Sequence, residues 1–238
     1  MIRALTLIAI ACAAYLAADV AHEGLGHGGT CIALGGRMLL LDTTYEDCSV
    51  HSRWIDLAGP LVGLVVALAA WFAARRTHGN ARVFFALVFA FAAFWNLGYM
   101  LKSGLAYAGD WHFAIAGLEP AGAWHIALAV AGLALYIAAM RMLAVVWPAG
   151  DDMPSGTFAT VAYLAAAVLS AAGGLLDPRG PQAVFSDALP SSLGSIGLVL
   201  VGLRRRSGVA LAVSWAWIAA GIVSAVIFVR LLGPGLRF

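Results

Sequence analysis

Seven long apolar runs separated by short polar loops constrain this chain more than any other feature. A bilayer core about 30 Å thick is crossed by about 20 helical residues, and a helix satisfies its backbone polar groups internally. On this basis the predicted spans are 4–27, 55–74, 83–101, 122–146, 157–176, 188–203 and 209–231. The run 188–203 is short, so six spans are the alternative count. The sequence therefore predicts an all-α polytopic membrane protein.

The composition supports the same class. Of the 238 residues, 63% are hydrophobic and only 11% are charged, whereas a soluble domain carries about 25% charged residues. The formal net charge is +2, and no basic stripe alternates with aromatic residues, so a nucleic-acid partner is not expected. The lipid bilayer is the predicted surrounding of most of the chain.

The distribution of arginine predicts the orientation. Arginines cluster before the first span, after the second and after the sixth, at Arg3, 75–82 and 204–206. Because basic loops stay in the cytoplasm, the N-terminus is predicted there. The loops 28–54, 102–121 and 177–187 then lie together on the outer side. The first run lacks a cleavage site and is interpreted as a retained span; with the short loops, this favours a bacterial inner (plasma) membrane.

A cluster of ionisable residues ends the first span. His22, Glu23 and His27 follow Asp19 within nine residues. Such groups cost about 2.5–3.5 kcal/mol each at membrane depth, which indicates a functional role. A His-Glu pair followed by a second histidine on a helix is typical of zinc hydrolases, in which the glutamate takes a proton from metal-bound water.

The spacing of the two histidines leaves two arrangements open. His22 and His27 are five residues apart, which separates them by about 140° on a straight α-helix, against about 40° for the usual spacing. A π-bulge would restore a common face, and Asp19 could then orient the second ring nitrogen of His22. Alternatively, Asp19, Glu23 and His27 share one face of a regular helix, with His22 turned aside. A third interpretation is that these groups only satisfy one another within the bundle.

Two cysteines bracket a segment predicted to be extended. Cys31 and Cys48 lie in the outer loop around residues 38–45. A disulfide between them would close a loop of about 17 residues and stabilise the fold by about 3 kcal/mol. Two free thiols, or a metal-binding role for one of them, are the alternatives.

Polar groups are distributed unevenly between two parts of the chain. Residues 1–146 contain nearly all the intramembrane polar groups and are predicted to be the membrane core that carries the site. A loop at 147–156 leads to residues 157–238, which are predicted to form a helical scaffold.

The first part resembles the site-2 protease family of intramembrane zinc metalloproteases. In that family a His/Glu helix precedes an extended segment, as Gly35-Gly36-Arg37 follows the cluster here. The next span opens with an Ala-Gly-Pro-like turn, similar to Ala58-Gly59-Pro60. A later asparagine and aspartate match Asn96 and Asp110. The resemblance covers about residues 15–115, with one residue more between the histidines than in the family motif.

The resemblance implies a fold, an activity and a set of roles. His22, His27 and Asp110 would bind one Zn²⁺, Glu23 would be the general base, and Asn96 would support the site. The substrate would be a transmembrane segment of another protein that unwinds locally before cleavage.

Several alternatives remain at this point. Asp110 could instead cap the turn before Trp111, and His112 or His125 could replace it as third ligand. A protein of the same fold could also bind metal, transport it or regulate a partner helix without catalysis. Lys102 lies at a span end, where a long side chain can reach the membrane surface.

Overall fold

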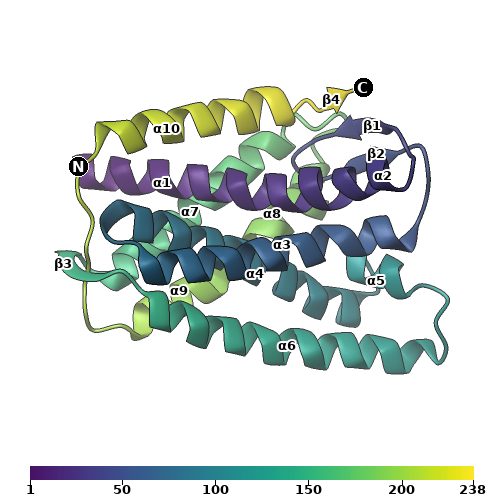
Figure 1. The fold of residues 1–238 in the computed structure, drawn as a ribbon, viewed down its shortest axis with the longest axis horizontal. Helices are drawn as coiled ribbons and strands as arrows, with labels where there is room; N and C mark the ends of the chain where they lie inside the picture. The colour runs from purple at the N-terminus through teal and green to yellow at the C-terminus, as the bar shows by residue number, and fades with distance from the viewer.

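Seven helical segments long and apolar enough to cross a membrane run side by side along the molecule (Figure 1). This computed structural model describes residues 1–238 and confirms the prediction of an all-α polytopic membrane protein. The spans are Ile2–Ala33, Arg53–Arg76, Gly79–Ala106, Ala121–Val146, Ser155–Gly174, Val184–Arg204 and Trp215–Leu232.

Four spans are regular α-helices and three change helix type along their length. The regular ones are α3 (Arg53–Arg76), α4 (Gly79–Ala106), α6 (Ala121–Val146) and α7 (Ser155–Gly174). The first span consists of α1 (Ile2–Asp19), the π-helix η1 (Val20–Gly28) and α2 (Gly29–Ala33). The sixth consists of η2 (Val184–Ala188), α8 (Leu189–Leu193), η3 (Gly194–Ile196) and α9 (Gly197–Arg204). The seventh consists of α10 (Trp215–Val226) and η4 (Ile227–Leu232).

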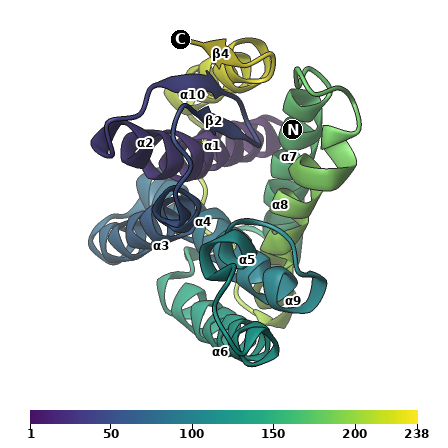
Figure 2. The same ribbon diagram turned by 90° about the vertical axis from the view of Figure 1, so that its right-hand side faces the viewer.

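Helix α4 occupies the centre of the bundle. It packs against α1, α3 and α6, and Figure 2 shows it between α1 on one side and α6 on the other. Its phenylalanines Phe89, Phe91 and Phe94 are fully buried and join Tyr15 of α1 in the main hydrophobic core. The central helix therefore fixes the positions of the first and second spans, which carry much of the site described below.

A small antiparallel sheet covers one end of the bundle. Its order is β2 (Glu46–Cys48), β1 (Met38–Leu41) and β4 (Leu236–Arg237). Strand β1 is the extended segment predicted after the first span, and the C-terminal β4 pairs with it through Leu40 and Arg237. Together with α2 and the short helix α5 (Asp110–Ile115), the sheet lies at the end of the bundle opposite the N-terminus and β3 (Ala149–Met153) (Figure 1).

The last span begins later than the hydropathy predicts. Residues from 209 onward are apolar, but the helix starts only at Trp215. Val209 instead forms antiparallel bridges with two residues of β3, and Ala210 donates a backbone hydrogen bond to the Pro148 carbonyl. The predicted 147–156 loop therefore contains a short strand, because a distant segment supplies its pairing partner.

Candidate metal centre

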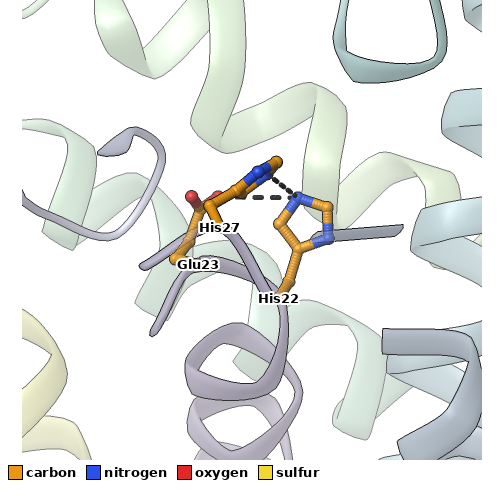
Figure 3. A group of neighbouring side chains, drawn as sticks. All are labelled: His22, Glu23 and His27. Carbon is orange, nitrogen blue, oxygen red and sulfur yellow. Dashed lines mark hydrogen bonds and ion pairs between the residues drawn. The ribbon is translucent and has the colours of Figure 1, made fainter. Parts of the chain in front are cut away.

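The first span changes to a π-helix at the histidines. In a π-helix the backbone bonds connect residues five apart, and the N–H of Gly29 donates to the carbonyl of Gly24. This repeat stacks side chains that are five residues apart. His22 and His27 consequently face each other with Glu23 beside them (Figure 3). Of the two arrangements that the spacing of the histidines left open, the structure therefore adopts the π-helical one.

Two glycines allow the π-helix to approach α3 closely. A Cβ atom on Gly26 would lie 2.5 Å from the Cα of Gly59, which is closer than real Cβ contacts come. A Cβ atom on Gly59 would overlap the imidazole of His27. Side chains at these positions would separate η1 from α3, so the glycines set the place of His27.

Hydrogen bonds fix the orientation of both imidazoles. The Nδ1 of His22 donates to Oδ1 of Asn96 at 2.8 Å, and Nδ1 of His27 donates to the Ile55 carbonyl at 2.7 Å. The amide of Asn96 is itself oriented, because its Nδ2 donates to the Ala92 carbonyl at 2.7 Å. Each histidine then carries its proton on Nδ1, and its Nε2 lone pair is free to bind a metal.

The two free nitrogens converge with one carboxylate oxygen. The Nε2 atoms of His22 and His27 are 3.2 Å apart, and Oδ2 of Asp110 lies 3.1 Å from the first and 3.5 Å from the second. Tetrahedral zinc with bonds of 2.0–2.1 Å places its ligand atoms about 3.3 Å from one another. Three acceptors at this separation repel one another unless a cation or proton lies among them. The geometry therefore fits a tetrahedral divalent metal ion.

Asp110 is turned toward the histidines and does not cap its helix. It is the first residue of α5, and no side-chain capping bond forms at that end. Burial alone would favour the neutral carboxyl, but the positive charge of His27 and His22, when these rings are protonated, outweighs burial and holds the pKa of Asp110 below its usual value. A metal cation bound to the two neutral imidazoles would favour the ionised carboxylate in the same way.

Glu23 lies beside these three atoms. Its Oε1 is 3.8 Å from Nε2 of His22, and its side chain is buried. The possible ligand atoms of His22, Glu23 and His27 all lie within 4.8 Å of one another. A carboxylate next to the metal position, at a longer distance than the three converging atoms, is placed to accept a proton from bound water.

The structure does not bring every candidate residue to the centre. Neither carboxylate oxygen of Asp19 has a hydrogen-bond partner, and Asn96 occupies the supporting position on His22 that the sequence offered to Asp19. His125 lies elsewhere: its ring packs 3.7 Å from that of Tyr107, and His112 packs against the same pair. Asp110, rather than His112 or His125, therefore completes the cluster.

A disulfide connects the end of the site helix to the sheet. Cys31 of α2 and Cys48 of β2 are bonded with an S–S distance of 2.01 Å. Glu46, two residues before Cys48, lines the same cavity as the histidines. The bond therefore ties the strand that forms part of the cavity wall to the span that carries the cluster.

The cluster opens into a polar cavity of about 430 Å³. Its wall also contains charged residues for which the sequence predicted no role in the site. They are Glu46, Asp56, Lys102, Arg179 and Asp187. Most of them belong to or border the three loops predicted on the outer side. Their predicted location on one side of the membrane was the only indication in the sequence that they could lie together.

Comparison of the chain with protein-family models, with curated proteins and with solved structures finds no match.

Proposed function

We propose that this protein is a zinc-dependent intramembrane metalloprotease that resembles the site-2 protease family. The observation that carries the proposal is the convergence of His22, His27 and Asp110 at 3.1–3.5 Å with the carboxylate of Glu23 beside them. Two imidazoles and a carboxylate form a common catalytic zinc ligand set, which leaves a fourth position for water.

Each residue has a distinct role in the proposed reaction. His22, His27 and Asp110 would hold the zinc ion, which when bound lowers the pKa of a water molecule to about 7 and polarises a carbonyl. Glu23 accepts the proton of the attacking water and delivers it to the leaving amine nitrogen as the C–N bond breaks. Asn96 and the Ile55 carbonyl keep the two imidazoles in the tautomer that exposes Nε2.

We infer that the cavity opens toward the outer side of a bacterial inner membrane. The arginine clusters at the ends of α3 and α9 belong to the predicted cytoplasmic loops. The histidines lie at the other end of the first span, beside the sheet. A membrane-protein substrate would enter with its backbone locally unwound, because a helical peptide bond is shielded within its own hydrogen bonds.

Hydrolysis by detergent-purified protein tests the proposal. With fluorescently labelled casein as an unfolded probe, the wild type should cleave and Glu23→Gln should lose at least about 100-fold in rate. Both proteins should contain equal zinc by elemental analysis, because Glu23 is not a ligand in this account. If the variant loses its metal, Glu23 is a ligand; if both proteins bind metal and neither hydrolyses the probe, the protein is a metal-binding protein without protease activity.

A further inference from the structure

The cavity beside the cluster contains two basic side chains in different states. Arg179 is saturated: its guanidinium donates to Asp177 at 2.7 Å, pairs with Asp187 at 3.2 Å and lies over the Tyr45 ring. These bonds outweigh burial and hold the pKa of Asp177 below its usual value. Arg179 therefore connects the turn after β1 to the segment before η2. Its charge is neutralised by these carboxylates, so it is not available to a ligand.

Lys102 has no such partner. It is the only lysine of the chain and lies half-buried in the last turn of α4. No carboxylate oxygen lies within 4.0 Å of its ammonium, and the nearest aromatic ring, Tyr99, has its centroid 5.1 Å from Nζ. A half-buried cation without a counter-charge is costly to keep. Since it lines the cavity, a ligand in the cavity can supply the missing negative charge.

Lys102 belongs to the wall on the Asp110 side of the cluster. Tyr99, one turn earlier on α4, packs so tightly against the backbone of Gly109 that a Cβ atom there would lie 2.5 Å from its hydroxyl. Gly109 directly precedes Asp110. Lys102 and Tyr99 therefore line the same cavity as Asp110, on its α4 side.

The wall near His27 has the opposite charge. Asp56 follows Ile55, whose carbonyl holds His27, and Glu46 of β2 lies on the same side. An anionic group is repelled from that end, whereas at the α4 end Lys102 supplies an unpaired positive charge and a bound metal would neutralise Asp110. A carboxylate fits this field better than a doubly charged phosphate, because five acidic side chains line the cavity and repel a dianion more strongly.

We propose that Lys102 binds a carboxylate of the substrate, so that peptides with an acidic group beside the scissile bond are preferred. This inference rests on the proposed function, because it places the carboxylate relative to the bond that is cut. The carboxylate can belong to an acidic side chain or to a free C-terminus, and both have the same chemistry.

Three hydroxamate-capped dipeptides test the proposal without requiring turnover. They end in glutamate amide, glutamine amide, or glutamine with a free carboxylate, and their binding to zinc-loaded protein in detergent is measured by titration calorimetry. The wild type should bind at least one carboxylate probe about tenfold more tightly than the neutral one. Which of the two is preferred distinguishes a side-chain carboxylate from a terminal one.

Variants locate the preference. Lys102→Met should abolish it, Lys102→Arg should retain it, and Arg141→Met, which removes an exposed cation of α6 outside the cavity wall, should retain it. Zinc content is measured on the same samples. Equal binding of all three probes by zinc-loaded wild type, or a preference that survives in Lys102→Met, contradicts the carboxylate site and leaves the protease proposal standing. A wild type that takes up no zinc overturns both.

Discussion

Two helix interfaces of this protein both depend on glycine, but for different reasons. Where α3 meets η1 and α4, a Cβ atom on Gly59 would overlap His27, and one on Gly63 would overlap the amide of Asn96. Where α4 meets α6, a Cβ atom on Gly132 would lie 2.7 Å from the backbone nitrogen of Leu101. The first interface makes room for polar side chains of the site, and the second lets two backbones approach.

Glycine therefore serves the candidate site at one interface and helix packing at the other. At the α4–α6 interface glycine permits the close helix packing that is common in membranes. On α3, Gly59 and Gly63 are four residues apart, and this small-xxx-small pair positions one candidate metal ligand and the residue that orients another. A methyl group added on α3 should therefore weaken metal binding, whereas one added at the α4–α6 interface should lower only the stability.

Gly59→Ala should have the largest effect. The added methyl group displaces the His27 imidazole, whose ring is held from behind by the Ile55 carbonyl. We expect zinc affinity to fall at least about 100-fold, measured by competition with a chromogenic chelator. Unchanged affinity would mean that His27 is not fixed against α3 in the way described.

Asn96→Leu should weaken zinc binding by about 10- to 100-fold, because His22 loses the partner that fixes its tautomer. Asp19→Asn is the matched control, since its carboxylate contacts neither histidine, and its zinc affinity should equal that of the wild type. If the chelator competition instead showed weaker zinc binding in Asp19→Asn than in Asn96→Leu, Asp19 would be the residue that orients His22.

Gly132→Ala should lower the free energy of unfolding by about 1–3 kcal/mol, because the methyl group overpacks the α4–α6 contact. Denaturant or thermal unfolding in detergent measures the loss. The folded fraction should bind zinc with wild-type affinity. A large loss of zinc affinity here would show that the two interfaces do not differ in the proposed way.

Asp42→Asn should have the smallest effect and lies outside both interfaces, in the turn after β1. Burial raises the pKa of Asp42 from 3.8 to about 6. The folded state then binds more protons than the unfolded state between these values, so stability falls as the pH rises through this window.

The variant should remove this dependence. Its amide oxygen can still accept the bonds that Oδ1 receives from Thr44. At about pH 8 it should be more stable than the wild type by about 1–2 kcal/mol, and at about pH 4 the two should be equal. Thermal unfolding at both pH values is the measurement, and equal stability of the two proteins at the higher pH would contradict the cost assigned to the buried charge.

The spans could be predicted because hydropathy is a local property of the chain. The boundary of the last span could not, since Val209 extends to pair with β3 from a separate part of the sequence. Helix type followed partly from local spacing: His22 and His27 are five residues apart and need a π-helix to share a face. That this segment adopts it depends on its contact with Gly59 of α3.

The surroundings of the cluster were harder to infer, because they come from distant segments. Sequence proximity allowed Asp19 as the support of His22, and only the family resemblance pointed to Asn96, which the fold brings there from 74 residues away. Lys102 was interpreted as a span-end lysine directed at the membrane surface, and the packing of α4 in the bundle centre turns it into the cavity wall instead. Arg179 and Asp187 come from the part predicted as scaffold.

The central claim is that His22 and His27 bind one metal ion together, and the metal content of the purified protein tests it most directly. Elemental analysis should find close to one zinc ion per chain in the wild type after zinc is supplied, and almost none in His22→Ala. Zinc retained in His22→Ala, or no zinc in the wild type, would contradict the site built on the π-helix.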